Sequence, residues 1–231
     1  MPDDTARHAV GALRLREGAA VTLFNGCGAE YHGSLVLQGK GAAVLVAQCT
    51  APQRESNLHI TLAQGISSGE RMDLTLQKSV ELGIAAIQPV MMRRSVVKLS
   101  GDKSDRRLRH WQGVVVSACE QCGRNVIPPV APIAEFMQWL REIKREVQAS
   151  SVAPVCYLLD PAAQVGLRDL PAPSGPIFLL AGPEGGFDPV ERNAALEAGC
   201  LPVRLGPRIL RTETAALAAL AAMQTLWGDF Q

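Results

Sequence analysis

The sequence predicts a small antiparallel β module followed by an α/β domain with a mostly parallel sheet. In the first third of the chain, short apolar stretches are separated by turn dipeptides such as Asn25-Gly26. Further along, apolar residues at helical spacing alternate with short apolar strands, which is typical of a parallel sheet covered on both faces. Two of the later strands run through Gly-Pro directly into a helix, which suggests a ligand site at the edge of that sheet.

Bulk composition describes an ordinary globular chain. It has 231 residues, 47% hydrophobic and 19% charged, with a net charge of +1. That balance excludes disorder and argues against a general polycation for nucleic acids, although a local basic face stays possible. Residues 1–10 show no basic stretch followed by an apolar core, and the apolar run at residues 215–223 is too short to span a bilayer. We expect a soluble cytoplasmic protein that does not act at a membrane.

Each element of the β module follows from alternating apolar residues and turn signals. We expect strands at residues 20–24, 31–38 and 42–48, joined by turns at Asn25-Gly26 and at residues 39–41. These strands would form a small barrel. Residues 50–57 are polar and contain a proline, so we expect a linker there.

The α/β domain is predicted because the apolar residues change from alternating to helical spacing. Residues 70–82 place Met72, Leu76 and Val80 on one helical face, and residues 105–121 do the same with Trp111 and Val115. Strands are expected at residues 58–66, 84–91, 155–160, 177–181 and 203–205, and further helices at residues 135–147, 189–198 and 213–227. We place the two domains at residues 1–66 and 67–231.

The cysteines do not form a recognisable metal site. Of the six, only Cys119 and Cys122 lie close together, as CEQC. A lone pair of this kind is compatible with half a zinc site or a redox pair, but zinc needs further ligands at compatible spacing. We expect reduced thiols and no bound metal.

The stretch GPEGG, residues 182–186, follows one predicted strand and precedes a helix. Asp188 can cap that helix, Pro189 suits its first position, and Glu191 could close a capping box. The glycines let a ligand approach backbone donors, yet no phosphate-binding motif is present and Glu184 would repel phosphate. The loop therefore favours a neutral or cationic ligand, such as a nucleoside without phosphates or a sulfonium, while a tight turn without a ligand remains the alternative.

A second stretch, LGPRILRTETAALAAL at residues 205–220, also runs through Gly-Pro into a helix. Arg208, Arg211 and Glu213 crowd its start, where Thr212 could cap the helix and Glu213 would favour its positive end. Two glycine loops that follow adjacent strands would form one pocket.

These stretches carry a resemblance to a known family. GPEGG and LGPRILRTETA, together with HAVGALRLREG (8–18), QKSVELG (77–83), RRSVVK (93–98) and ACEQCGRN (118–125), resemble the RsmE-type 16S ribosomal RNA methyltransferases. That family belongs to the SPOUT class and methylates N3 of a uridine. The matching stretches cover essentially the whole chain and follow one another in the family's order, although Gly11 stands where many members have an arginine.

The resemblance implies a PUA-like RNA-binding β-barrel followed by a trefoil-knotted methyltransferase domain with S-adenosylmethionine in the knot. It also implies a homodimer that acts on 16S ribosomal RNA within the small ribosomal subunit. The implied cofactor-binding residues are Leu180, Gly182, Pro183, Glu184, Gly185, Gly186, Leu205, Gly206, Ile209, Leu210, Thr212 and Ala215.

Chemistry and charge suggest further roles. Methylation of N3 requires loss of its proton, so a cation near the uracil oxygens and a base would help. We assign the cation to Arg211, with Arg124 as a second candidate, and leave Glu184 and Glu213 as candidate bases or hydrogen-bond acceptors. Residues 93–109 hold seven basic residues, including Lys98, against two acidic ones, which favours phosphate contacts. The candidate RNA-binding residues are Arg14, Arg93, Arg94, Arg106, Arg107 and Arg124.

Each of these charged residues has a simpler interpretation. Glu184 could only hold its loop, Arg211 could pair with Glu213, and a basic run could be a solvated helix face. An RNA-binding assembly factor that keeps the fold without methylating is the alternative function.

Overall fold

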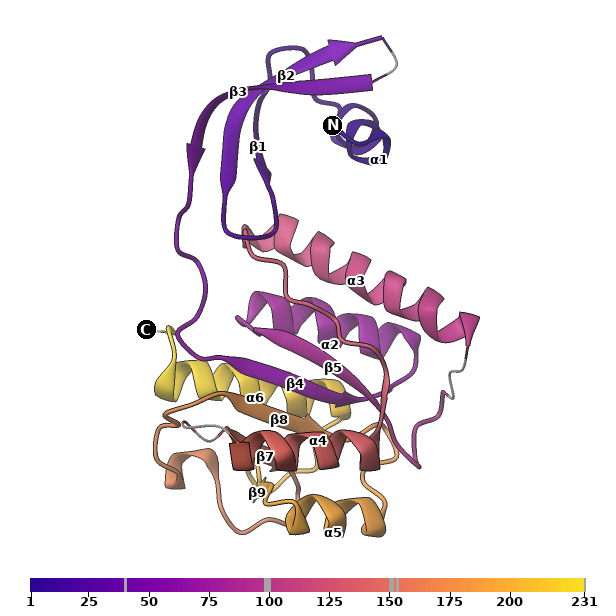
Figure 1. The fold of residues 1–231 in the computed structure, drawn as a ribbon, viewed down its shortest axis with the longest axis vertical. Helices are drawn as coiled ribbons and strands as arrows, with labels where there is room; N and C mark the ends of the chain where they lie inside the picture. The colour runs from indigo at the N-terminus through magenta and orange to yellow at the C-terminus, as the bar shows by residue number, and fades with distance from the viewer. Residues whose placement is uncertain (40, 98–100, 150–151, 153, 231) are drawn as a thin grey trace. The chain divides into compact units, whose positions relative to one another are not determined.

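The computed structural model describes residues 1–39, 41–97, 101–149, 152 and 154–230 (Figure 1). The chain divides into two compact units, Met1–Glu55 with Gly123–Ile127, and Ser56–Cys122 with Pro128–Gln231. This division comes earlier than the boundary we expected after residue 66, because the strand before that point pairs within the second unit. Residues 123–127 return to the first unit, which the sequence did not indicate.

The first unit is an antiparallel sheet with a short helical segment packed on it. Its elements are α1 (Asp3–Arg7), the π-helical turn η1 (His8–Ala12), β1 (Ala20–Phe24), β2 (Glu30–Gln38) and β3 (Gly41–Thr50). The strands pair in the order β1-β2-β3. The helical start was not expected, but Ala6 is buried with Leu35 and Ala42 in the small core of this unit. The sheet of the described residues has β1 and β3 as its edges, so closure into a barrel stays a prediction.

The predicted Asn25-Gly26 turn is present between β1 and β2. The Asn25 side chain accepts hydrogen bonds from the backbone N–H groups of Cys27, at 2.8 Å, and Ala29, at 3.2 Å. Gly26 has a φ of 77°, in the left-handed region that glycine adopts without a steric cost.

Residues 123–127 are fixed in the first unit by buried polar groups. The Asn125 amide donates to the carbonyl oxygens of Gly28 and Pro52, at 3.1 and 3.0 Å, and to the Glu30 carboxylate at 3.2 Å. The Arg124 guanidinium is buried and ion-paired with Glu55. This segment is therefore part of the structural core of the unit.

The second unit is a six-stranded parallel sheet between helices, as the alternating pattern predicted. Its strands are β4 (Ile60–Gly65), β5 (Ala86–Met91), β6 (Ala134–Glu135), β7 (Val155–Leu159), β8 (Ile177–Ala181) and β9 (Leu201–Val203). Its helices are α2 (Gly69–Glu81), α3 (Asp102–Cys122), α4 (Phe136–Ala149), the 3₁₀ turn η2 (Leu167–Asp169), α5 (Pro189–Glu197) and α6 (Thr212–Trp227). The strand order is β6-β5-β4-β8-β7-β9, and all pairings are parallel.

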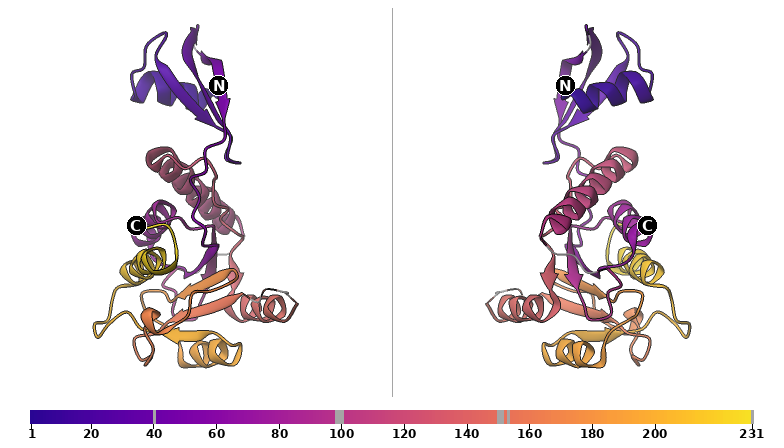
Figure 2. Two further views of the ribbon diagram at one scale, coloured as in Figure 1. Left: turned by 90° about the vertical axis from the view of Figure 1, so that its left-hand side faces the viewer. Right: turned by 90° about the vertical axis from the view of Figure 1, so that its right-hand side faces the viewer.

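Helices cover both faces of this sheet (Figure 2). Helices α2 and α6 pack together on one face, with α3 against α2. On that side Tyr157 of β7 stacks on Trp227 of α6, with ring centroids 6.1 Å apart. Helices α4 and α5 cover the other face, where Trp139 and Phe178 pack edge to face. Buried apolar side chains on both faces supply the main stabilisation of such a sheet.

Most predicted boundaries agree with the structure, and two do not. Helix α3 begins at Asp102 rather than at residue 105, and the last strand is Leu201–Val203 rather than 203–205. The start of this last strand was missed because it contains Pro202, and proline is uncommon inside a strand; β9 accommodates it at the edge of the sheet. The trefoil knot implied by the family resemblance stays a prediction.

Among the described residues, no helix is long and apolar enough to cross a membrane. Within the same part of the chain, no group of His, Cys, Asp and Glu is arranged to hold a metal ion. Cys119 is buried in α3, and Cys122 is exposed at its end.

Candidate functional site

The GPEGG loop joins the buried strand β8 to helix α5 and is constrained by close backbone approaches. A Cβ on Gly65, at the end of β4, would lie 2.6 Å from the backbone nitrogen of Pro183. A Cβ on Gly185 would lie 2.9 Å from the Cβ of Arg94. Gly65 and Gly185 are therefore needed for packing within the protein.

The start of α5 is capped largely as predicted. Asp188 accepts a hydrogen bond from the Val190 N–H at 3.0 Å, and Pro189 occupies the first helical position. The expected capping box is wrong, because the buried Glu191 carboxylate accepts from the backbone N–H of Arg93 at 2.9 Å instead. This contact connects the end of β5 to α5.

A cavity of about 500 Å³ lies where β7, β8 and β9 end. Its wall is formed by the segments that follow these strands, with one side chain each from α2 and α5. The lining residues are Arg71, Leu159, Asp160, Pro161, Ala181, Gly182, Pro183, Glu184, Gly186, Phe187, Arg192, Val203, Leu205, Arg208, Ile209, Leu210, Arg211, Thr212, Glu213 and Ala215. The two glycine stretches thus share one pocket, as the sequence predicted.

Most of the residues expected at the cofactor site line this cavity, and three do not. Leu180 is fully buried in the core formed with α4 and α5. Gly185 faces Arg94, and Gly206 forms a turn at a φ of 77°. A cofactor contact of these three residues stays a prediction. Arg124 is also absent from the lining, since its guanidinium is held by Glu55 in the first unit.

Sequence reasoning missed the segment after β7. Asp160 and Pro161 line the cavity, and the Asp160 carboxylate binds the Arg192 guanidinium of α5 at 2.7 Å. A usable signal was present, because Asp160-Pro161 lies at the end of a predicted strand whose neighbour in the sheet carries GPEGG. Arg71 was missed because nothing in its local pattern brings α2 to this pocket.

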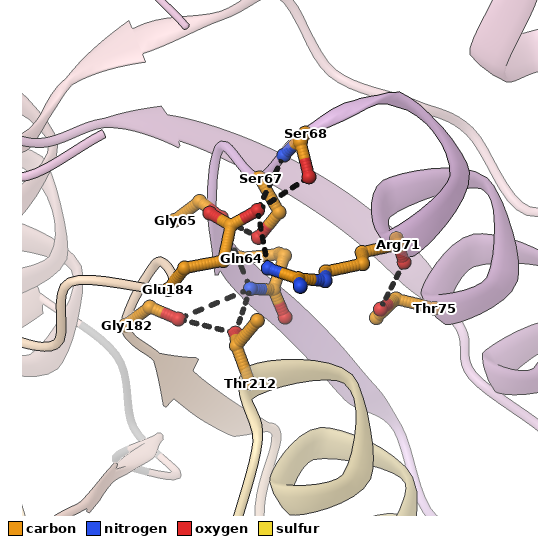
Figure 3. Close-up of polar contacts among 9 residues, drawn as sticks. All are labelled: Gln64, Gly65, Ser67, Ser68, Arg71, Thr75, Gly182, Glu184 and Thr212. Carbon is orange, nitrogen blue, oxygen red and sulfur yellow. Dashed lines mark hydrogen bonds and ion pairs between the residues drawn. The ribbon is translucent and has the colours of Figure 1, made fainter. Parts of the chain in front are cut away.

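Glu184 is held by the segment after β4 (Figure 3). Its Oε1 accepts hydrogen bonds from the N–H and the hydroxyl of Ser68, both at 2.7 Å, and lies 3.4 Å from Nη1 of Arg71. Burial raises the pKa of Glu184, but the Ser68 hydrogen bonds and the Arg71 charge outweigh it, so the pKa is lowered overall. The side chain is therefore a fixed carboxylate.

Gln64 joins the two glycine loops at their base (Figure 3). It is fully buried at the end of β4, and its amide nitrogen lies 3.0 Å from the Thr212 hydroxyl and 3.3 Å from the carbonyl oxygen of Gly182. The Thr212 hydroxyl donates to the same carbonyl oxygen. This use of the hydroxyl replaces the helix cap that we expected from Thr212, and Arg211 occupies the N-cap position of α6 without a side-chain cap.

Arg211 and Glu213 line the cavity at the start of α6. Arg211 is exposed, and no ion pair of this side chain is present within the described residues. Oε2 of Glu213 is buried and has no hydrogen-bond partner in that part of the chain. The alternative interpretation, in which Arg211 pairs with Glu213, is therefore not supported by the described contacts.

The candidate RNA-binding arginines have different surroundings. Arg93 pairs with Asp188 at 3.2 Å, and Arg94 donates to the Gly185 carbonyl at 3.1 Å, so both also support the GPEGG loop. On α3, Arg106 is exposed and Arg107 is half-buried. Arg14 in the first unit is exposed at a φ of 53°, and Lys98 lies outside the described residues.

Comparisons with known proteins agree with this architecture. A family model described as an RNA methyltransferase domain matches residues 54–224, and one described as an RNA methyltransferase PUA domain matches residues 2–47. The chain is 34% identical to the ribosomal RNA small subunit methyltransferase E of Mycobacterium bovis, over 96% of this chain and 84% of that protein.

Two solved structures are also similar. One is a ribosomal RNA small subunit methyltransferase E of Neisseria gonorrhoeae bound to S-adenosylmethionine, with 45% identity, a TM-score of 0.89, and 100% of this chain and 92% of that chain covered. The other is a putative methyltransferase of Legionella pneumophila in complex with the same cofactor, with 38% identity, a TM-score of 0.92 and the same coverage. The chain belongs to the ribosomal RNA small subunit methyltransferase E family of RNA methyltransferases.

Proposed function

We propose that this protein transfers a methyl group from S-adenosylmethionine to N3 of a uridine in 16S ribosomal RNA. The observation that supports this most is the single cavity between the GPEGG and GPRILRTET loops, at the carboxyl ends of three parallel strands. Ligands of open α/β sheets bind at such edges.

The residues of the cavity fit the cofactor. Its volume of about 500 Å³ lies within the range of small-molecule sites, which is about 300–1,000 Å³. The ionised Glu184 and the buried, unpartnered Oε2 of Glu213 can accept from a cationic ligand, and two of the four arginines that line the cavity, Arg71 and Arg192, are already paired with carboxylates. When bound, S-adenosylmethionine supplies a methyl group on a positively charged sulfur.

Of the two carboxylates, Glu213 is the better candidate to accept the N3 proton. Glu184 is a weak base, because three donors already stabilise its charged form. Each carboxylate keeps a buried Oε2 without a donor among the described residues, which the N3–H group of a uracil would satisfy, but only Glu184 has its charged form stabilised by Ser68 and Arg71.

Arg211 is suited to stabilise the negative charge that develops on the uracil oxygens. It lines the cavity, is exposed, and lies at the N-terminus of α6, where the helix dipole also favours negative charge. Arg124 has no support for this role, since its guanidinium is occupied by Glu55.

RNA would contact basic side chains of α3, and the PUA-like unit would add further contacts. Arg106 and Arg107 lie on α3, and Arg14 is exposed in the first unit. We also propose a homodimer, the small ribosomal subunit as the context of the reaction and the cytoplasm as its place, on the basis of the family. Sedimentation of the purified protein alone tests the homodimer, and sedimentation with small ribosomal subunits tests the association with them.

The decisive test is to map N3-methyluridine in 16S ribosomal RNA from cells with and without this gene. We expect one modified position to disappear and to return when the wild-type protein is supplied. If the methylation pattern is unchanged while the protein still binds the RNA, the chain is a non-catalytic assembly factor.

A further inference from the structure

The residues that hold Glu184 lie on a different element from Glu184 itself. Ser68 is the N-cap of α2, where a serine ordinarily uses its side-chain oxygen to accept a backbone N–H of its own helix. Here Ser68 makes no side-chain cap, and its hydroxyl donates to Glu184 instead. The Glu184 carboxylate also accepts the Ser68 N–H, one of the backbone donors that lack an acceptor within the start of α2.

The electrostatic surroundings favour a permanent negative charge at this point. The side chain of Glu184 is 14% exposed, so the carboxylate is shielded from water. It lies at the positive end of α2, and Arg71, in the first turn of that helix, adds a positive charge at 3.4 Å. The other charged residues that line the same cavity are Asp160, Arg192, Arg208, Arg211 and Glu213.

We propose that Ser68 and Arg71 are positioning residues of the cofactor site: they hold Oε1 of Glu184 in its ionised form and leave the buried Oε2, which has no partner among the described residues, for a cationic ligand. The identity of that ligand, S-adenosylmethionine, rests on the function proposed above. The contacts themselves join residues of the protein.

A double-mutant cycle tests whether Arg71 acts through Glu184. The dissociation constant of S-adenosylmethionine is measured by calorimetry for Arg71→Met, Glu184→Gln and the double variant. We expect each single variant to weaken binding about tenfold, as for loss of a charged hydrogen-bonding group, and the double variant to bind no more weakly than Glu184→Gln. Arg71→Lys should restore most of the affinity, and Arg141→Met, on the exposed face of α4, serves as the matched control.

The pH dependence supplies a readout that a purely structural role would not change. In the wild-type protein the carboxylate stays charged in mild acid, so we expect affinity to change less than about twofold from pH 7 to 5. The Ser68→Ala/Arg71→Met variant keeps the burial of Glu184 but loses two donors, so protonation should begin at higher pH. We expect its affinity to fall about tenfold over the same range, whereas Glu184→Gln should show no such dependence.

A measurement without cofactor separates this proposal from the proposed function. Because the folded pKa of Glu184 is lowered, the charge stabilises the fold above the unfolded pKa and this stabilisation is lost as pH falls through the folded pKa. The melting temperature of Ser68→Ala/Arg71→Met should therefore lie below that of the wild type at neutral pH and approach it in acid. Additive losses in the cycle, or a difference in melting temperature independent of pH, would overturn the positioning role even if the wild type methylates RNA.

Discussion

The two glycine loops of the pocket differ in how firmly the protein holds them. The GPEGG loop is held from several sides: Ser68 and Arg71 bind Glu184, Arg94 binds the Gly185 carbonyl, and Pro183 packs on Gly65. The GPRILRTET loop is exposed along residues 206–209, and the Ile209 side chain is 86% exposed. Its described anchor to the first loop is Thr212.

This difference suggests a division of roles. A loop fixed by internal contacts presents a preorganised surface and loses little entropy when a ligand binds. A loop with an exposed apolar side chain and two exposed arginines retains groups that a ligand or an RNA can cover. We interpret GPEGG as the fixed wall of the site and GPRILRTET as its adaptable wall.

Gly65→Ala should disrupt the fixed wall, and we expect it to have the largest effect of the substitutions on stability and cofactor binding. The new Cβ would lie 2.6 Å from backbone and ring atoms of Pro183, which have little room to move. We expect a loss of about 1–3 kcal/mol in the free energy of unfolding, as for overpacking, with loss of cofactor binding. Denaturant unfolding measures it, and Gly113→Ala in α3, with open space around its Cβ, should be neutral or stabilising. An unaffected Gly65→Ala protein would show that the GPEGG wall is not rigid.

Arg211→Ala addresses the adaptable wall. Because this side chain is exposed, we expect the melting temperature to stay near that of the wild type. Single-turnover methylation at saturating cofactor and RNA should slow about 100-fold, as for loss of one donor that stabilises a developing negative charge. A rate within about twofold of the wild type would remove Arg211 from the chemistry.

Gln64→Leu should loosen the connection between the two walls. The substitution removes hydrogen bonds to Gly182 and Thr212 and leaves a buried site of similar size. We expect a loss of about 1 kcal/mol in stability for a hydrogen bond and a several-fold weaker affinity for S-adenosylmethionine. Gln138→Leu, exposed on α4, is the control. Equal affinities for Gln64→Leu and the wild type would mean that the loops are positioned independently.

Charge reversal of Arg106 and Arg107 should have the smallest effect, because it lies outside the cofactor pocket. We expect unchanged binding of S-adenosylmethionine and a shallower salt dependence of RNA affinity, by about one unit of slope for each lost phosphate contact. RNA binding titrations at several salt concentrations measure this. An unchanged slope would place the RNA elsewhere.

The sequence predicted what depends on local patterns. The spacing of apolar residues identified the parallel sheet and its helices, and glycine-rich turn signals identified the two loops. Asp188-Pro189 and Asn25-Gly26 act through adjacent residues, so the helix start and the turn could be predicted as well. It did not predict contacts that the topology creates. Arg71 reaches Glu184 only because β4 lies beside β8 in the sheet, and Arg124 is used by Glu55 only because residues 123–127 return to the first unit.

Hydrogen–deuterium exchange with and without S-adenosylmethionine tests the central interpretation most directly. The amides of residues 182–187 should exchange slowly already in the free protein, and those of residues 206–213 should become strongly protected when the cofactor binds. If the cofactor left residues 206–213 unprotected, or protected only a distant segment, the cavity between these loops would not be its site.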